Sequence, residues 1–299
     1  KAMFPNHVEQ CLQRLWEAGF QAYPVGGCVR DILLGRTPGD WDVTTSALPE
    51  ETMAVFGSHA FPTGLQHGTV TVRQDHQAIE ITTYRVESSY SDHRHPDSVR
   101  YTLSLKEDLA RRDFTINAMA YHPDRGLVDL FGGREDLQNR IIRCVGDPAT
   151  RLTEDALRIL RGVRFCVQLG FSPDPATEQA LFDCRAGLSR ISAERIAAEL
   201  ISTLSCGSPA AKGLSLMSRA SLWDYVLPEV KNSNITKYFE TEKSLFAALD
   251  CLPSDASLRL SLLLCGTDEA GARAACRRLK LSNKMTEAVT TYVATLTLD

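Results

Sequence analysis

The spacing of apolar residues changes near residue 150, and this change most limits the folds open to the chain. Between residues 20 and about 145, short β-type runs such as GTVTVRQ and QAIEITTYRV alternate with pieces of helical type, CVRDILLG and FTINAMAY. From about residue 150, segments such as TEDALRILRGVRFCVQLG and SAERIAAELISTLS keep the helical period, and no strand pattern recurs. The pattern predicts an α+β fold, in which a part with a mixed β-sheet precedes an all-helical part.

Composition limits the class of protein further. A chain of 299 residues with a net charge of −4 carries no general signal for nucleic acid, so any RNA binding must come from local patches. The nine cysteines never form a C-x-x-C pair, which argues against zinc clusters and favours reduced, buried thiols in the cytoplasm. The first segment reads as an amphipathic helix and lacks the apolar run of a signal peptide, and LSLLLC is too short to span a bilayer. We therefore expect a cytoplasmic protein without a membrane partner.

A glycine pair in VGGCVRDILLG is the first candidate for phosphate binding. Gly26 and Gly27 precede a predicted helix, so backbone N–H groups, the helix dipole and Arg30 are suited to hold a phosphate. The alternative is an ordinary strand-turn-helix junction, because Gly-Gly turns are common.

Two acidic residues in PGDWDVTT are candidates for a metal site. Side chains alternate along a strand, so Asp40 and Asp42 share one face while Trp41 and Val43 anchor the other in the core. Neighbouring like charges are unfavourable unless compensated, and their hard oxygen atoms suit Mg²⁺. The alternative is the solvated face of an edge strand.

Glu80 is the third acidic candidate, because it lies between two isoleucines in QAIEITTYRV and points away from them. If its strand neighbours that of Asp40 and Asp42, three carboxylates meet the needs of a two-metal phosphoryl-transfer site. The alternative is a half-exposed strand glutamate.

HGT (67–69) and EDLARRDFTINAMA (107–120) supply further donors. Arg111 and Arg112 suit a triphosphate or ribose, with Asp113 ordering them and FTINAMA packing as a helix. The alternative for paired arginines is plain surface charge.

A predicted helix over residues 154–165 carries a second kind of signal. Asp155 and Arg158 stand three residues apart beside an apolar face, and an acceptor next to a donor matches the Watson–Crick edge shared by cytosine and adenine. Guanine and uracil present the opposite pattern and would mismatch both groups. The alternative is an ion pair on an amphipathic helix, whose buried face we expect to consist of Ala156, Ile159, Leu160, Val163 and Cys166.

Taken in order, YPVGGCVRDILLGRTPGDWDVTTSA, HGT, IEITTYR, RRDFTINAMAY, DLFGG, RIIRCVGDP and EDALRILRGVRF closely resemble the class II tRNA nucleotidyltransferases. This family contains the bacterial CCA-adding enzymes, the A-adding enzymes and the bacterial poly(A) polymerases. The resemblance is dense from about residue 20 to 205, where RISAERIAAEL is similar to the family's last motif.

The resemblance implies a division into a nucleotidyltransferase head (1–145), a helical neck with the nucleotide-recognition helix (146–230), and a helical body and tail contacting tRNA (231–299). The chain ends at Asp299, short of most relatives, so an incomplete tail is one interpretation. Near that end, a basic cluster could contact the tRNA backbone or form a solvated helix face; it consists of Arg273, Arg277, Arg278, Lys280 and Lys284.

The resemblance also implies roles for individual residues. Mg²⁺ binding and catalysis fall to three carboxylates, those of Asp40 and Asp42, which hold the metal, and Glu80. Contacts with the triphosphate, ribose and phosphates fall to Gly26, Gly27, Arg30, Arg112 and Asp113. Recognition of the incoming base falls to Asp155 and Arg158, with Arg161 and Arg164 completing the pocket.

The implied reaction is the addition of C and A from CTP and ATP to the 3′ end of tRNA. The tRNA 3′-hydroxyl attacks the α-phosphate and releases pyrophosphate. Alternatives are an A-adding enzyme, a poly(A) polymerase and, more remotely, a non-catalytic RNA-binding protein.

Ala156-Leu157 resembles the CCA-adding pattern more than that of the poly(A) polymerases. Residues 86–109 resemble the family's flexible loop for switching from C to A, although Arg94-His95 stands where two arginines are frequent. The oligomeric state stays open.

Overall fold

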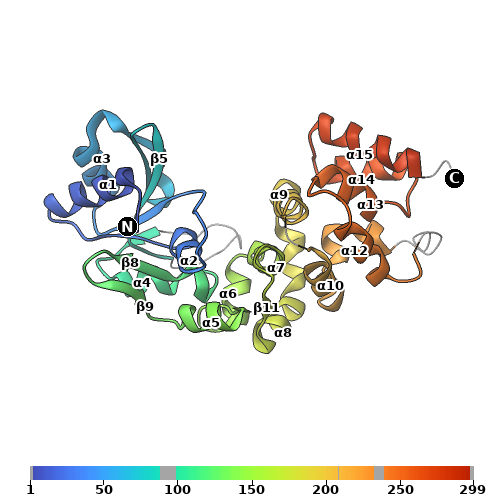
Figure 1. Cartoon of the computed structure of the whole chain (residues 1–299), viewed down its shortest axis with the longest axis horizontal. Coiled ribbons are helices and arrows are strands. Elements are labelled where there is room, and N and C mark those ends of the chain that lie inside the picture. Colours follow the sequence, from blue (N-terminus) through green and yellow to red (C-terminus); the bar gives the residue numbers. More distant parts are fainter. Residues whose placement is uncertain (1–2, 88–98, 208, 232–238, 297–299) are drawn as a thin grey trace. The chain divides into compact units, whose positions relative to one another are not determined.

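The computed structural model describes residues 3–87, 99–207, 209–231 and 239–296 (Figure 1). The chain forms two compact units. The head unit consists of residues 1–139 and 143–147, and the helical unit of residues 140–142 and 148–299. Most of the predicted 86–109 loop and of the polar break at 228–240 lies outside the described residues. Within the described part, no helix is long and apolar enough to cross a membrane.

The head unit is built on a five-stranded mixed sheet, as predicted. Its strands, in spatial order, are β1 (Ala22–Pro24), β2 (Asp42–Thr45), β5 (Gln77–Thr83), β4 (Thr69–Gln74) and β3 (Ala60–Gly64). Strands β2 and β5 pair in parallel, and all other neighbours in this sheet are antiparallel.

Alternation along the strands separates the two faces of this sheet. Val43 on β2 and Ile79 and Ile81 on β5 are at most 1% exposed and belong to the apolar face. Helices α1 (Asn6–Glu17) and α3 (Pro49–Phe56) pack against the sheet (Figure 1). The opposite face carries the polar side chains of β2 and β5, which are Asp42, Thr44, Glu80 and Thr82.

A two-residue turn joins β4 to β5. Its residues, Asp75 and His76, have φ values of 50° and 62°, the left-handed conformation of a type I′ hairpin turn. The tight turn pairs Gln74 with Gln77 and thereby sets Thr71 opposite Glu80.

Shorter elements complete the head unit. They are the helices α2 (Gly27–Leu33), α4 (Leu105–Ala110) and α5 (Gly133–Asn139), and the hairpins β6 (Arg85–Glu87) with β7 (Val99–Tyr101) and β8 (Met119–His122) with β9 (Gly126–Asp129).

The prediction of a helix over FTINAMAY is wrong. Residues Thr115–Asn117 form a single 3₁₀ turn, and Met119–His122 then pair with β9 as strand β8. Residues 114–120 are buried throughout, so no exposed face marks a period, and a short run of this kind does not separate strand from helix.

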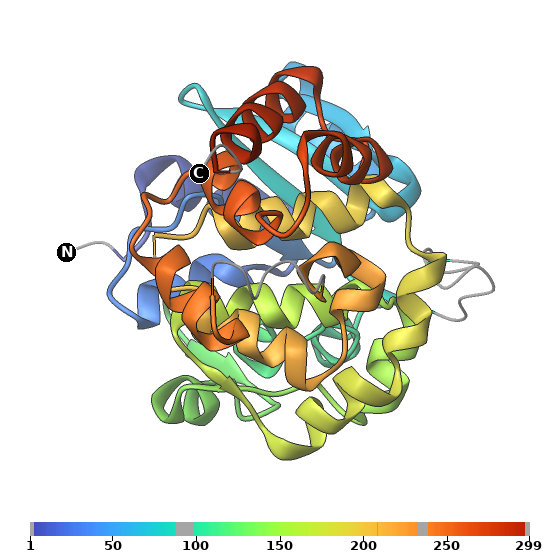
Figure 2. The same ribbon diagram turned by 90° about the vertical axis from the view of Figure 1, so that its right-hand side faces the viewer.

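The helical unit follows the predicted pattern closely. Its helices are α6 (Pro148–Glu154), α7 (Leu157–Leu169), α8 (Pro175–Asp183), α9 (Ala193–Leu204), α10 (Ala211–Arg219), α11 (Trp223–Val226), α12 (Glu242–Asp250), α13 (Ala256–Leu263), α14 (Glu269–Arg278) and α15 (Asn283–Leu296). Helix α7 packs against α9 and α10, while α15 packs against α13 and α14 (Figures 1 and 2). Contrary to the expectation of no strand, Ile141–Ile142 (β10) and Ser172–Pro173 (β11) form a two-residue parallel pair.

The helix predicted over 154–165 is interrupted at Asp155 and Ala156, between α6 and α7. Asp155 Oδ1 accepts a hydrogen bond of 3.0 Å from the backbone N–H of Leu157, at the start of α7. An aspartate that binds a nearby amide in this way favours a helix start over a helix interior. The predicted apolar face is confirmed, since every member is at most 3% exposed: Ala156, Ile159, Leu160, Val163 and Cys166.

Candidate active site

The parallel pairing of β2 with β5 brings two of the three predicted carboxylates together. Asp42 opens β2 and is the direct partner of Glu80 on β5, so the two side chains lie on the same face. Asp40 is exposed and lies in a bend before the strand, separated from Asp42 by Trp41, which is 9% exposed. Trp41 is therefore a core anchor as predicted, although the strand begins at Asp42, two residues later than the alternation from Asp40 indicates.

The charges around Asp42 do not cancel. Burial, together with the like charges of Glu80 and Asp40, raises the pKa of Asp42 to about 6, although the positive charge of Arg112 opposes them. The carboxylate therefore lies in a position that favours a bound proton or another cation.

The donor set fits a hard divalent cation, of the kind nucleotidyltransferases use. Within the described ranges, no three His, Cys, Asp or Glu side chains are grouped closely enough to enclose a metal ion. Such a cage is not needed, because Mg²⁺ is commonly held by one or two carboxylates together with waters and substrate phosphates. Asp42 and Glu80, which lie on one face of the sheet, are compatible with that lower requirement, and a part for Asp40 stays a prediction.

The glycine turn lies directly against an arginine. Gly26 has φ 78° and ψ −131°, a conformation essentially restricted to glycine. A Cβ atom at Gly26 would lie 3.1 Å from Nη1 of Arg112. The Gly26 N–H donates to the Met119 carbonyl (3.0 Å), so this amide is not the free phosphate donor that the turn indicates. Helix α2 begins at the next glycine, Gly27.

Arg30 is fixed inside the head unit. It is 5% exposed, forms an ion pair of 2.8 Å with Asp31, and donates from Nη1 to Oδ1 of Asn117 over 2.8 Å. The contact with Asn117 has no signal in the sequence, since 87 residues separate Asn117 from Arg30. A phosphate contact by Arg30 stays a prediction.

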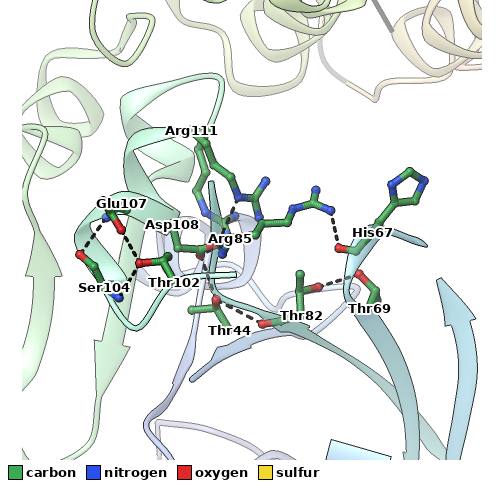
Figure 3. Close-up of polar contacts among 11 residues, drawn as sticks. Thr44, His67, Thr69, Thr82, Arg85, Thr102, Ser104, Glu107, Asp108 and Arg111 are labelled. Carbon is green, nitrogen blue, oxygen red and sulfur yellow. Dashed lines mark hydrogen bonds and ion pairs between the residues drawn. The ribbon is translucent and has the colours of Figure 1, made fainter. Parts of the chain in front are cut away.

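That Asp113 orders the paired arginines stays a prediction, since Asp113 is an electrostatic neighbour of Arg112, but the sequence analysis missed a second carboxylate that contacts both arginines. This carboxylate is Asp108 of α4, which lies 3.1 Å from Arg111 Nε (Figure 3). It also lies 3.6 Å from Arg112 Nη2. Asp113 is 8% exposed and accepts the N–H of Phe114. The i, i+3 and i, i+4 spacing from Asp108 to the two arginines is the sequence signal that indicates the correct partner.

The HGT segment holds the strand that follows β5. The His67 carbonyl accepts a hydrogen bond from the guanidinium of Arg85, and the Thr69 and Thr82 hydroxyls lie 2.9 Å apart (Figure 3). Gly68 has φ 75°, and a Cβ there would lie 2.9 Å from the Tyr101 ring. The described contacts of the HGT segment are thus with other residues of the head unit.

In the helical unit, Asp155 and Arg158 do not pair with each other. Asp155 Oδ2 accepts from Arg195 over 2.8 Å, and Arg158 Nη1 donates to Glu154 over 2.6 Å. The side-by-side ion pair expected from i, i+3 spacing is therefore replaced by two separate pairs. The break before α7 removes Asp155 from the helical geometry on which that expectation depends.

The last motif supplies partners that the sequence did not assign. Arg195 and Glu199 lie one turn apart on α9, where Arg195 holds Asp155 and Glu199 pairs with Arg164 over 2.7 Å. Arg161 and Arg164 both lie over the Phe165 ring, with Cζ at 5.5 and 4.5 Å from its centroid. The i, i+4 spacing of Arg195 and Glu199 in SAERIAAEL is the sequence signal for these two ion pairs.

The two units match two family models. Residues 22–143 match the poly A polymerase head domain, and residues 170–233 match the probable RNA and SrmB-binding site of polymerase A. The first unit matches the head-domain model and places Asp42 opposite Glu80 on neighbouring strands, beside the glycine turn. It is therefore a nucleotidyltransferase head.

Relatives narrow this class to one family. The CCA-adding enzyme of Leuconostoc mesenteroides is 48% identical over 219 residues, covering 73% of this chain and 54% of the relative. That of Bacillus cytotoxicus is 45% identical over 250 residues, covering 81% and 62%. The crystal structure of the Bacillus stearothermophilus CCA-adding enzyme in complex with CTP matches with a TM-score of 0.83 and 35% identity, over 99% of this chain and 70% of that one. The chain belongs to the tRNA nucleotidyltransferase family of these CCA-adding enzymes, which confirms the resemblance of its motifs. It spans about half the length of the first of these relatives.

Proposed function

We propose that the chain carries the catalytic part of a tRNA nucleotidyltransferase that adds C and A, from CTP and ATP, to the 3′ end of tRNA. The observation that carries the proposal is the position of Asp42 and Glu80, which are direct partners on neighbouring strands. Burial and the charge of Glu80 raise the pKa of Asp42. Both carboxylates belong to the same site as Arg112, which lies against the glycine turn. The names of the relatives support the same activity.

The head unit would hold the triphosphate and the reacting hydroxyl. Asp40 and Asp42 would bind Mg²⁺, with Glu80 as third carboxylate. Mg²⁺, when bound, supplies the positive charge that stabilises phosphate oxygens and makes a hydroxyl a better nucleophile. The tRNA 3′-hydroxyl then forms a bond to the α-phosphorus, pyrophosphate leaves, and the hydroxyl proton passes to a carboxylate or to water.

Other head residues would fix the nucleotide. Gly26 leaves room for Arg112 to approach the turn at which the phosphates would bind. Gly27 and Arg30 would line that turn, and Asp113 would face the ribose.

Base selection would fall to the helical unit. Asp155 accepts and Arg158 donates, as the edges of cytosine and adenine require. Their side chains are 16% and 11% exposed, so a base would exchange for part of the contacts that Arg195 and Glu154 now make. Arg161 and Arg164 would complete the pocket.

The tRNA acceptor stem and 3′ end would be the macromolecular partner, in the cytoplasm. The proposed body and tail, residues 231–299, would contact its backbone. Three members of the basic cluster already have acidic partners, Arg273 with Glu287, Arg278 with Glu229 and Lys280 with Glu194, so their contribution to RNA binding would be reduced.

The test is an incorporation assay with Mg²⁺, labelled CTP or ATP, and tRNA ending in the discriminator base, in C or in CC. We expect C on the first two ends and A on the third. Incorporation of ATP alone on the CC end would make the protein an A-adding enzyme, and untemplated tracts of A would make it a poly(A) polymerase. Absence of incorporation from every substrate would refute the proposal in favour of a non-catalytic RNA-binding protein.

Replacement of Asp42 tests the assigned site. Asp42→Ala should lower the rate by about three orders of magnitude or more while tRNA binding stays nearly intact, because the change removes charge stabilisation at the reacting phosphate. The matched control is Asp124→Ala, at an exposed aspartate after β8 in the same unit, which should keep wild-type activity. Retained activity of Asp42→Ala would contradict the metal assignment.

A further inference from the structure

Asp108, which has no assigned role, is a fully buried carboxylate that joins four parts of the head unit. Its side chain is 0% exposed on α4. Oδ1 accepts from the backbone N–H of Arg85 (3.2 Å) and from Arg111 Nε (3.1 Å). Oδ2 accepts from the hydroxyl of Thr44 over 2.9 Å (Figure 3). The same oxygen faces Arg112 Nη2 at 3.6 Å. Both oxygens are therefore used, and two cations balance the single negative charge.

These partners lead directly to the proposed catalytic site. Thr44 lies two residues after Asp42 on the same face of β2, so a bond to Thr44 fixes the strand that presents Asp42. Arg112 lies against Gly26, where a Cβ atom would be 3.1 Å from Nη1. The ion pair with Asp108 therefore restrains the guanidinium that borders the glycine turn.

Few other contacts restrain Arg112. Its Nε–H is buried and donates to no partner in the part of the chain that the structure describes. Its electrostatic neighbours besides Asp108 are the Arg111 cation, which repels it, and the carboxylates of Asp42 and Asp113. Without the charge of Asp108, Arg112 would lose its largest electrostatic attraction while the repulsion by Arg111 would remain, so its position beside the turn would no longer be fixed.

We propose that Asp108 is a positioning residue for nucleotide binding: it acts through Arg112, holding that guanidinium beside the glycine turn so that it meets the phosphates of either nucleotide. This inference rests on the proposed function. A buried carboxylate with a purely structural role would affect the amount of folded protein, whereas a positioning role affects the affinity for nucleotide. Because CTP and ATP share the triphosphate, both affinities should change by the same factor.

The first experiment compares Asp108→Asn with wild type in the incorporation assay. The amide oxygen, in the place of Oδ1, can still accept from the Arg85 N–H, and the NH₂ group, in the place of Oδ2, can donate to the Thr44 hydroxyl, but the side chain carries no charge for Arg111 and Arg112. We expect the KM values for CTP and ATP each to rise by about 10- to 100-fold, with the KM for tRNA within about twofold of wild type. Nucleotide KM values that stay within twofold of wild type would overturn the proposal.

The matched control is Asp136→Asn. Asp136 is also a buried aspartate of the head unit, 5% exposed, and it accepts from the Thr115 hydroxyl (2.6 Å) and Arg143 Nε (3.1 Å). We expect this variant to lose thermal stability without a change in nucleotide KM. An equal rise in KM in both variants would show that loss of any buried charge has this effect, and would also overturn the proposal.

A double-mutant cycle tests whether Asp108 acts through Arg112. Arg112→Ala combined with Asp108→Asn should be no worse in nucleotide KM than Arg112→Ala alone, because the residue to be positioned is absent. Effects that multiply would instead indicate independent roles. If Asp108→Asn does not fold, Thr44→Val decides: it removes one hydrogen bond to Asp108, and a rise of about 3- to 10-fold in both nucleotide KM values is expected, whereas no rise overturns the proposal.

Equilibrium binding of CTP and ATP separates this proposal from the proposed function. If wild type binds both nucleotides but transfers neither, the proposed function fails, and the dissociation constants of Asp108→Asn and Asp136→Asn decide on the role of Asp108. If wild type binds neither nucleotide, both proposals fail.

Discussion

Among single residues, Asp42 combines its proposed role with a cost in stability. Burial and the like charges of Glu80 and Asp40 raise its pKa from 3.8 to about 6. Between these two pH values the folded protein holds a proton that the unfolded chain has released, so this residue makes stability fall as the pH rises through the window. Above about pH 6, Asp42 is charged in the folded protein, and the full cost of burying this charge lowers the free energy of unfolding.

Replacing Asp42 with asparagine should therefore stabilise the metal-free protein at neutral pH. We expect Asp42→Asn to increase the free energy of unfolding at pH 7.5 by at most about 3 kcal/mol, and the gain to disappear as the pH falls below about 4. Urea unfolding with a chelator across this pH range measures the difference. A gain that grows as the pH falls would contradict the assignment, and added Mg²⁺ should narrow the gap by stabilising wild type only.

Residue chemistry and alternation predicted part of the site correctly. Trp41 and Val43 are in the core, and Asp42 and Glu80 share a face, because strand period and burial are local properties of the sequence. The partner of Arg112 was missed because Asp113 is its neighbour in sequence, whereas the pair forms with Asp108, one helical turn away.

At the level of elements, helices α7 and α10 approach so closely that only glycine fits between them. A Cβ atom at Gly213 of α10 would lie 2.2 Å from Cγ2 of Val167 and 3.5 Å from the Val163 carbonyl. Helix α7 carries Arg158 and begins just after Asp155, so this packing fixes the element on which the proposed base recognition would depend.

The change Gly213→Ala should destabilise the protein by about 1–3 kcal/mol, because the added methyl group overpacks the contact with Val167. The control is Gly207→Ala: a Cβ at Gly207 meets nothing within 4 Å, and stability should change by about 0.5 kcal/mol or less. Thermal unfolding of both variants measures the effects. Equal stability of the two variants would show that α7 and α10 move apart readily.

Elements with a clear period were predicted well, and those without one were not. Strands β4 and β5 alternate, and α9 keeps one apolar stripe, so their types follow from spacing alone. FTINAMAY is buried on all sides, so its strand character comes from pairing with β9. The break at Asp155 depends on a side-chain bond to Leu157 and on Arg195, a partner 40 residues away.

Over the whole molecule, the cysteines divide by access to solvent. The expectation of buried thiols holds for six of the nine cysteines, while Cys184 and Cys206 are half-buried and Cys251 is exposed. Burial raises the pKa values of Cys11 and Cys166 to about 12, which keeps these thiols protonated and unreactive.

Alkylation of the native protein at pH 8 should therefore modify Cys251 first and Cys184 and Cys206 more slowly. The remaining cysteines should react only after unfolding, since both burial and protonation suppress the thiolate. Peptide mass spectrometry over a time course measures the order, with a urea-unfolded sample as the control in which all nine react. Early modification of Cys11 or Cys166 would contradict the described core.

The hairpin turn at Asp75 and His76 has a consequence for how the family can vary in length. Because the turn contains only two residues, each position counted back from it has a fixed partner, and Glu80 is set opposite Thr71 and beside Asp42. A codon gained or lost between His76 and Glu80 would turn this carboxylate to the apolar face. We therefore expect family members to lack insertions and deletions in this short stretch, whereas their surface loops can vary in length.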